Sequence, residues 1–277
     1  MDPRTTPARP DLAAAFLQGK VEAARFVEGK AYAVARGRCS LQHAPARDAA
    51  QDSEVLHGEI FTVYEENNGW AWGQAARDSY VGYVHTIALS EMIEADYEVA
   101  ALMTPVLPAP DAKRPLVDLL PMNARVKVLA HENSYARIAG NLCVRESHLR
   151  PLGEHAPDWV AVAERFLGAP YVWGGRTQAG LDCSGLIQTA LQAGGIAAPR
   201  DTDMQMVLGA PVPVASDLSG LERGDLVFWK GHVGVMLDGA RLLHANAFHM
   251  EVAIELMAEA AVRIAKSAGV VIAIKRL

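Results

Sequence analysis

The sequence predicts an α+β protein in which two small all-β units precede a larger domain that mixes helices with strands. From about Lys30 to Arg150, short runs rich in β-branched and aromatic residues alternate with turn residues, which is typical of small β units. After Pro157, helix-like stretches come first and strand-like runs follow, which is typical of an α+β domain. We therefore divide the chain into residues 1–29, 30–94, 95–152 and 153–277.

Composition indicates a packed globular protein. The 277 residues are 51 % hydrophobic and 21 % charged, values that argue against disorder. The formal net charge is -6, whereas a chain that binds phosphates through Lys and Arg normally carries a basic excess. Nucleic acid is therefore not an expected partner.

The sequence shows no pattern of a secretory signal or a membrane span. Acidic residues and prolines interrupt the first segment, and the longest stretch without Asp, Glu, Lys or Arg, residues 183–199, contains Gln and Gly. The three cysteines are an odd set at wide spacing, unlike a disulfide framework. We expect a cytoplasmic protein with reduced thiols and no membrane contact.

The pattern predicts the following elements. Apolar residues recur at three-to-four spacing from Leu12 to Val27, which predicts a helix in an N-terminal arm. Strands are predicted in the β units at 60–64, 70–73, 80–84, 99–103, 116–120, 125–129 and 135–138, with the prolines at 105, 108 and 110 in a loop. The last domain should contain helices at 159–167 and 183–193 and strands at 226–229, 232–237, 242–245, 252–256 and 270–274.

Cys183 stands where a glycine-rich loop turns into an apolar helix. A thiol at a helix N-terminus faces unpaired backbone N–H groups, which lower its pKa and favour the nucleophilic thiolate. A buried structural cysteine would produce the same local pattern, because free Cys is among the most buried residue types. Position alone does not separate these two interpretations.

His232 and His244 supply the partners that a catalytic thiol needs. His232 opens a strand after the turn at Gly231, and the Asp238-Gly239 turn joins that strand to the one that carries His244. The hairpin should bring both imidazoles together. A nucleophilic cysteine needs a base, and the base needs a third polar group that fixes its tautomer. Either histidine alone would more commonly be a core or surface residue.

Six short motifs carry a family resemblance. They are Tyr171-Val172-Trp173-Gly174-Gly175, Leu181-Asp182-Cys183-Ser184-Gly185-Leu186, Arg200-Asp201-Thr202 with Gln205, Arg223-Gly224-Asp225-Leu226-Val227-Phe228-Trp229, Gly231-His232-Val233-Gly234-Val235 and Leu243-His244-Ala245. In order and spacing they resemble the NlpC-type papain-like cysteine peptidases, which cleave bacterial cell-wall peptides.

The resemblance implies a papain-like fold and assigns roles to residues. It implies Cys183 as nucleophile, His232 as general base and His244 as the third member. It further implies that the active site is lined by Tyr171 and that substrate is bound by Asp182, Ser184, Arg200 and Asp201. No cofactor and no metal are implied.

The two β units then resemble bacterial SH3-like barrels, an arrangement similar to the γ-D-glutamyl-L-diamino acid endopeptidases, the dipeptidyl-peptidase VI group. Those act on murein peptides with a free N-terminal L-Ala, and by that resemblance the first barrel closes the cleft with an acid that meets the ammonium. Glu59 and Tyr80 are the candidates, and Glu65 or Glu66 are the substitutes. A solvated turn residue is the competing interpretation of Glu59.

We therefore expect a cysteine endopeptidase that cuts the γ-D-Glu–diamino acid bond in murein peptide recycling. Three alternatives stay open: an inactive peptide-binding protein, an acyl transferase on the same frame, and a metal site built from Cys183, His232 and His244. The sequence does not determine whether the diamino acid is diaminopimelate or lysine.

Overall fold

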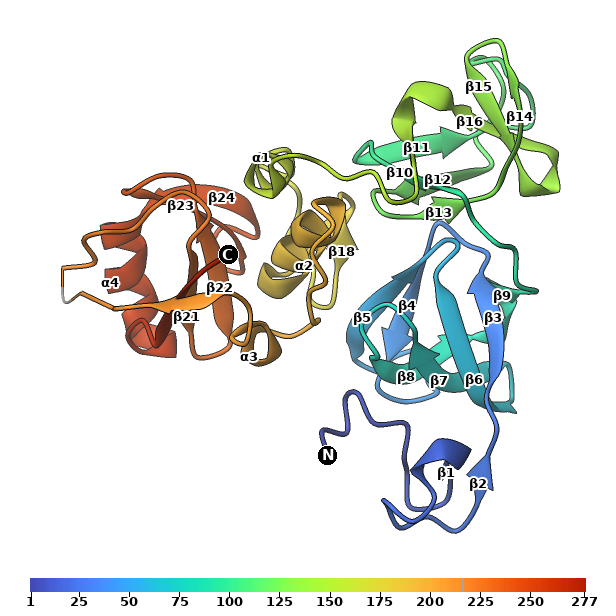
Figure 1. Ribbon diagram of the computed structural model, residues 1–277, viewed down its shortest axis with the longest axis horizontal. Helices are drawn as coiled ribbons and strands as arrows, with labels where there is room; N and C mark the ends of the chain where they lie inside the picture. The colour runs from blue at the N-terminus through green and yellow to red at the C-terminus, as the bar shows by residue number, and fades with distance from the viewer. Residues whose placement is uncertain (216) are drawn as a thin grey trace. The chain divides into compact units, whose positions relative to one another are not determined.

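The computed structural model describes residues 1–215 and 217–277, which form two compact units, Met1–Leu152 and Gly153–Leu277 (Figure 1). The first unit is almost entirely β-structure and holds one core in each of its two barrels. The second unit mixes helices with one large sheet and has a core of its own. The fold is α+β, with SH3-like barrels before a papain-like domain.

The N-terminal segment is not the helix that apolar spacing predicts. It forms two short parallel strands, β1 (Ala13–Ala14) and β2 (Phe26–Val27), with one 3-10 turn at Ala15–Leu17. Backbone bonds join distant parts of the segment instead of successive helical turns, as when the Ala24 amide donates to Pro10. The prediction is wrong because the chain folds back on itself and buries only Leu12 and Leu17 of the periodic apolar set, while Phe16 is 58 % exposed, so tertiary contacts override a helical spacing.

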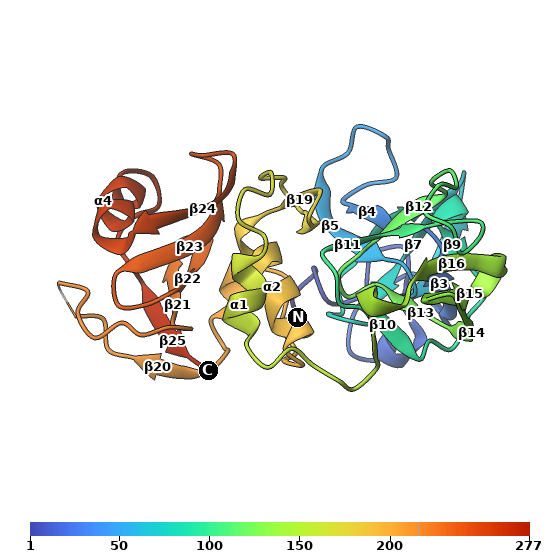
Figure 2. The same ribbon diagram turned by 90° about the horizontal axis from the view of Figure 1, so that it is seen from above.

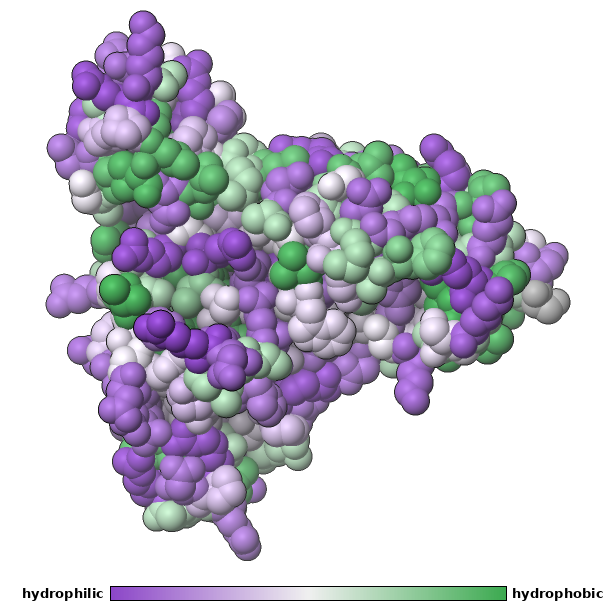
Figure 3. Space-filling view, turned by 180° about the vertical axis from the view of Figure 1, so that it is seen from behind, coloured by the Kyte–Doolittle hydropathy of each residue, from purple (hydrophilic) through white to green (hydrophobic). Residues whose placement is uncertain are grey.

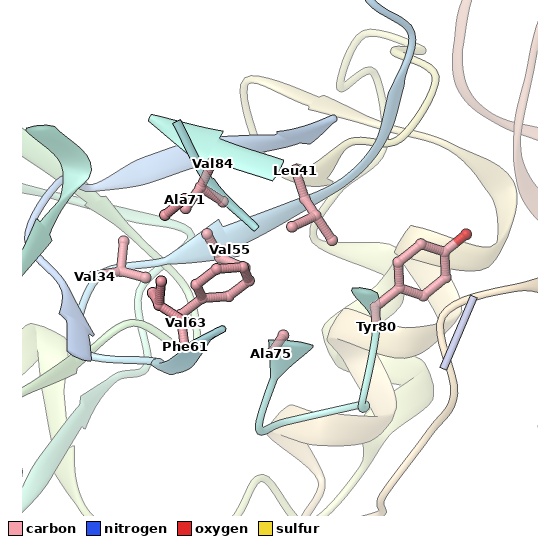
Figure 4. Close-up of a cluster of buried hydrophobic side chains, with 9 residues drawn as sticks. All are labelled: Val34, Leu41, Val55, Phe61, Val63, Ala71, Ala75, Tyr80 and Val84. Carbon is pink, nitrogen blue, oxygen red and sulfur yellow. The ribbon is translucent and has the colours of Figure 1, made fainter. Parts of the chain in front are cut away.

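The first barrel is a seven-stranded sheet in the order β5-β4-β8-β7-β6-β3-β9. Its strands are β3 (Lys30–Val34), β4 (Arg38–Gln42), β5 (Gln51–Leu56), β6 (Ile60–Asn67), β7 (Trp70–Ala75), β8 (Val81–His85) and β9 (Leu89–Ser90). Alternate residues such as Phe61 and Val63 point inward and fill the core. Figure 4 shows this cluster, with Tyr80 at its margin and its hydroxyl directed away from the other side chains.

The second barrel is built from three small sheets, β13-β10-β17, β11-β12 and β14-β15-β16. Its strands are β10 (Tyr97–Val99), β11 (Met103–Val106), β12 (Asp118–Pro121), β13 (Arg125–Val126), β14 (Val128–Glu132), β15 (Tyr135–Ile138), β16 (Leu142–Arg145) and β17 (Leu149–Pro151). Pro105 was expected in a loop but lies in β11. A proline is tolerated there because β11 pairs with β12 alone, as an edge strand.

In the second unit, a six-stranded antiparallel sheet lies between α4 and the pair of helices α1 and α2 (Figure 2). The helices are α1 (Trp159–Glu164), α2 (Cys183–Ala193), α3 (Thr202–Gln205) and α4 (Met257–Ala268). The sheet order is β20-β25-β21-β22-β23-β24, with β20 (Ala210–Val212), β21 (Leu226–Trp229), β22 (His232–Met236), β23 (Arg241–Asn246), β24 (Glu251–Leu256) and β25 (Ala273–Arg276). A small hairpin, β18 (Arg176–Thr177) and β19 (Gly180–Leu181), precedes α2.

Helix α4 is the longest of the elements that the sequence did not predict, a set that also includes α3, β4 and β5. Met257, Ala260 and Ile264 are buried at helical spacing against the sheet, so the signal was present but short. The predicted last strand, 270–274, begins later, at Ala273, because the chain must first leave α4 at Gly269.

The surface is mixed in polarity. Hydrophilic residues predominate on the face that Figure 3 shows, and apolar residues occur there in separate groups. Across residues 1–215 and 217–277, no helix combines the length and the apolar character that crossing a membrane requires.

Candidate active site

Cys183 is the first residue of α2, and the loop before it sets its position. Asp182 is the N-cap, and its Oδ1 accepts a 2.7 Å hydrogen bond from the Gly185 amide. A side chain at Gly185 has no room, because a Cβ there would lie 2.1 Å from the Gly175 carbonyl oxygen. The Gly174-Gly175 loop therefore crosses directly over the first turn of the helix and fixes where the thiol points.

A buried ion pair holds this helix start. Arg200 makes two bonds to Asp182, from Nη1 to Oδ1 at 3.0 Å and from Nη2 to Oδ2 at 2.6 Å. Ser184 Oγ joins the pair, since it accepts from Arg200 at 2.9 Å and lies 3.3 Å from Asp182 Oδ1. The Gly174 amide also donates to Asp182 Oδ2, at 2.8 Å. Asp182, Ser184 and Arg200, three of the residues predicted to bind substrate, are thus hydrogen-bonded to one another.

Tyr171 and Asp201 lie at the edges of this cluster. Tyr171 is half-buried, and burial followed by the nearby Cys183 raises its phenol pKa to about 12. Asp201 is partly exposed and occupies the N-cap position of the short helix α3, where its side chain makes no capping hydrogen bond. The structure therefore places Tyr171 near both Cys183 and the ion pair of Asp182 with Arg200.

The thiol is buried, which decides its charge in the resting protein. Burial, with the Asp182 carboxylate, raises the pKa of Cys183 to about 11 and outweighs the hydrogen bonds from Thr202 and from the Val233 and Ser184 amides. The expected lowering of the thiol pKa by the helix N-terminus is therefore wrong for the resting state. The contact with Val233 places the thiol beside the strand that begins at His232.

His232 and His244 are neighbours, as the hairpin predicts. His232 Nε2 lies 2.8 Å from His244 Nδ1, and the ring centroids are 5.1 Å apart. The register of β22 and β23 pairs Val235 with Leu243, so the two histidines are diagonal neighbours on one face. Gly234 lies between them, and a Cβ there would come within 3.1 Å of the His244 Cβ.

Both imidazoles are neutral in the resting state. Burial, and then the neighbouring His244, lowers the pKa of His232 to about 3. Burial also lowers the pKa of His244 to about 4, although Glu255 opposes the shift. Thiol and imidazoles are each held neutral, so the charged pair forms by transfer of one proton from Cys183 to His232.

Glu255 is the residue that sequence reasoning missed at this site. It lies in β24, and its Oε2 is 2.6 Å from His244 Nε2. Arg263 of α4 pairs with the same carboxylate. The signal in the sequence was weak, because an acid in a strand next to an unrecognised helix has no motif of its own.

Glu59 and Tyr80 belong to the first barrel. Glu59 is 2 % exposed, accepts from the Leu56 amide at 3.0 Å and pairs with Arg77 at 2.5 Å. The interpretation of Glu59 as a solvated turn residue is therefore wrong. Tyr80 is buried at the margin of the core (Figure 4). The substitute Glu65 pairs with Arg9 and Arg25, whereas Glu66 is exposed.

The metal alternative finds no matching geometry in the part of the chain that the structure describes. Residues 1–215 and 217–277 contain no group of three or more His, Cys, Asp or Glu side chains arranged to hold a metal ion.

A thiol at the start of a buried helix, beside two neighbouring strands that each carry one of two hydrogen-bonded histidines, defines a papain-like cysteine peptidase. The NlpC/P60 family model matches residues 168–265, and the model of the bacterial dipeptidyl-peptidase Sh3 domain matches residues 41–89. The chain therefore contains an NlpC/P60 domain, which is a cysteine peptidase and hence a hydrolase domain, and a bacterial dipeptidyl-peptidase SH3 domain.

Individual relatives extend this similarity along the chain. A Gamma-D-glutamyl-L-lysine dipeptidyl-peptidase of Bacillus subtilis (strain 168) is 28 % identical over 258 residues, covering 83 % of this chain and 81 % of that protein. A protein of the same name from Bacillus cereus is 36 % identical over 98 residues, covering 32 % of this chain and 28 % of that protein.

A solved structure shares the fold. The crystal structure of an NlpC/P60 family protein from Bacillus cereus ATCC 10987 superposes with a TM-score of 0.74 at 17 % identity, covering 89 % of this chain and 99 % of that chain.

Proposed function

We propose that this peptidase hydrolyses the γ-D-glutamyl–diamino acid bond of bacterial cell-wall peptides that carry a free N-terminal L-Ala. The observation that carries the proposal is the Cys183, His232 and His244 arrangement, with the Bacillus subtilis relative named as a γ-D-glutamyl-L-lysine dipeptidyl-peptidase. The motif that surrounds Cys183 supplies the rest of the support, because Tyr171 lies near the thiol and Arg200 pairs with Asp182, the residue before it.

The chemistry follows from the neutral resting groups. Cys183 Sγ gives its proton to Nδ1 of His232 and attacks the carbonyl carbon of the D-Glu side chain, forming a tetrahedral oxyanion. When the intermediate collapses, the C–N bond breaks and His232 returns the proton to the leaving amine. A water molecule then attacks the thioester, and one of its protons passes through His232 to the sulfur as the C–S bond breaks. Cys183 is restored as a thiol, and the γ-carboxyl group that leaves releases its remaining proton to solvent.

Recognition of the free amine is the finer part of the proposal. A carboxylate that faces an ammonium away from water discriminates strongly against an acylated terminus, because acylation leaves the carboxylate unpaired. Glu59 and Tyr80 are the proposed residues. Since Arg77 already neutralises Glu59, an ammonium would share this carboxylate with the guanidinium.

The decisive experiment is incubation of the full chain with L-Ala-γ-D-Glu-diaminopimelate and with the L-Lys analogue, with products identified by mass. We expect L-Ala-D-Glu and the free diamino acid, and no product from Cys183→Ala. Release of L-Ala alone, or transfer to an added amine in place of water, would contradict the proposed hydrolysis. The relative rates on the two peptides decide the diamino acid.

We further propose a cytoplasmic role in murein peptide recycling. Support comes from the expected preference for free peptides over intact wall. Fractionation of the producing cells, with immunodetection of the chain, tests this. Recovery of the full-length chain outside the cytoplasm, or efficient digestion of cross-linked wall, would contradict it.

A further inference from the structure

The hydrogen-bonded chain that begins at His232 continues past His244 to Glu255. His244 Nε2 lies 2.6 Å from Glu255 Oε2, and His244 is fully buried. The strand register explains the meeting, since Leu242 pairs with Glu255 and His244 pairs with Ala253, which makes His244 and Glu255 diagonal neighbours.

This contact decides which nitrogen of each imidazole carries a proton. An ionised carboxylate only accepts hydrogen bonds, so His244 Nε2 must donate to it. Neutral His244 then has an unprotonated Nδ1, which accepts from His232 Nε2 at 2.8 Å. Neutral His232 is left with an unprotonated Nδ1, the atom that takes the thiol proton.

Three charged or titratable groups face the Glu255 carboxylate. Arg263 of α4 donates from Nη2 to Oε2 and from Nε to Oε1, the latter at 3.3 Å. His249 of the β23–β24 loop lies 3.4 Å from Oε1, and His244 completes the set. Burial opposes ionisation of Glu255, but hydrogen bonds from Arg263 and His244 outweigh it, so its pKa lies below the usual value.

We propose that Glu255 is a positioning residue of this peptidase, which holds His244 as the Nε2–H tautomer and so keeps His232 ready to accept the proton of Cys183. The assignment rests on the proposed function for the roles of the two histidines. Arg263 has a second effect: it keeps Glu255 ionised while it offsets part of the negative charge that stabilises the imidazolium.

Two substitutions separate hydrogen bonding from charge. In Glu255→Leu no acceptor remains, the tautomer of His244 is no longer fixed, and kcat should fall about 10–100-fold while KM changes less than about threefold. In Glu255→Gln the amide oxygen is expected to face His244 and Arg263, because the amide NH₂ would repel both donors. This variant should retain a kcat within about fivefold of the unmodified protein, since the acceptor is kept. Glu259→Gln, an exposed acid on α4, is the matched control.

A charge test distinguishes positioning from a purely structural role. Glu255→Gln removes a negative charge near the imidazolium, so the alkaline limb of the kcat/KM profile should move down by about one pH unit. Arg263→Gln removes a positive charge, so the same limb should move up. A residue that only stabilised the fold would shift neither limb.

A second readout does not depend on the peptide substrate. The rate of Cys183 alkylation by iodoacetamide at pH 7 should fall in Glu255→Gln and rise in Arg263→Gln, each by about threefold to tenfold, because alkylation follows the population of the charged pair. If the two variants change the alkylation rate in these opposite directions but the unmodified chain does not turn over the peptide, the proposed substrate is wrong and the role of Glu255 stands.

The proposal is overturned if Glu255→Leu keeps the kcat of the unmodified chain, or if the Gln variants of Glu255 and Arg263 shift the profile in the same direction or leave it unchanged. If Glu255→Leu fails to fold, the opposite shifts of the two Gln variants decide alone.

Discussion

Two polar networks meet at Cys183, one on the helix side and one on the sheet side, and they are built in different ways. The helix-side network joins Asp182, Ser184 and Arg200, which lie within nineteen positions of one another in the sequence. The sheet-side network runs from His232 through His244 to Glu255 and is assembled by strand register and by α4. One network is local in the chain, and the other depends on tertiary structure.

Their exposure differs as well. Arg200 is 1 % exposed at the side chain, so the helix-side pair is closed to water. The sheet-side chain ends at Arg263 and His249, whose side chains are 25 % and 34 % exposed. A closed ion pair holds geometry, whereas a network that reaches solvent tolerates a change of charge at its inner end. The helix-side network therefore positions the Cys183 thiol, and the sheet-side network accepts the proton that the thiol releases.

The largest expected effect is at the thiol where the networks meet. Cys183→Ala should lower kcat by about 10⁴-fold or more, because a methyl group is not a nucleophile, while the melting temperature should change little. Cys183→Ser should be nearly as inactive, since a hydroxyl ionises far less readily than a thiol. Alkylation should be slow at Cys39 and Cys143 compared with Cys183. Activity close to normal in Cys183→Ala would remove the assignment.

The next effect tests the order of the sheet-side network. His232→Ala should lower kcat by about 10³-fold, because both the base and the proton donor to the leaving amine are lost. His244→Asn should be milder, by about 10–100-fold, since an amide still offers an acceptor to His232. Steady-state kinetics on the peptide measures both. A larger loss in His244→Asn than in His232→Ala would mean that the roles are reversed.

Breaking the helix-side network should cost stability. Arg200→Met leaves the buried Asp182 carboxylate without its counter-charge, and we expect the free energy of unfolding to fall by about 3–5 kcal/mol. Arg223→Met is the matched control in the same unit, because Arg223 forms exposed ion pairs with Asp158 and Glu164 and should cost at most about 1 kcal/mol. If urea denaturation gives equal losses of unfolding free energy for Arg200→Met and Arg223→Met, the buried helix-side pair contributes no more to stability than the exposed pairs.

A smaller effect concerns selectivity for the free amine. Glu59→Gln should reduce the preference for free over N-acetylated peptide by about 1–3 kcal/mol, the cost of a lost charged hydrogen bond. Glu54→Gln is the matched control, because Glu54 is also a buried acid of the first barrel paired with an arginine, Arg38. If both variants keep the preference for the free peptide, Glu65 or Glu66 becomes the candidate for recognition of the substrate ammonium. Equal rates on free and acetylated peptide in the unmodified chain would remove it altogether.

The smallest effect is the contribution of His244, on the sheet side, to the pH dependence of stability. The pKa of His244 is about 4 in the folded chain and near 6.5 in an unfolded one, so the unfolded state binds more protons between these values. Stability should therefore fall as the pH drops through this window. Differential scanning calorimetry should show a shallower fall in His244→Asn. An identical slope in both proteins would contradict the burial of a neutral His244.

Much of the site was readable from the sequence because its motifs are local. Cys183 with its N-cap Asp182 occupies adjacent positions, and the Asp238-Gly239 turn fixed the meeting of His232 with His244 within one hairpin. Short-range signals of this kind survive folding unchanged, since the residues are neighbours before any packing occurs. Strands β6, β7, β8 and β15 were placed for the same reason, through alternation and turns, whereas β4, β5 and β16 were not predicted.

Tertiary structure decided the features that depend on burial or on distant contacts. The sequence predicted a helix near Leu12 where the chain instead folds back and buries Leu12 and Leu17, and a lowered thiol pKa where burial raises it. It predicted no role for Glu255, whose meeting with His244 needs both the β23–β24 register and α4. The composition, motifs and hairpin determined the class of enzyme. Desolvation and long-range pairing, which have no local pattern, determined the charge state of its active site.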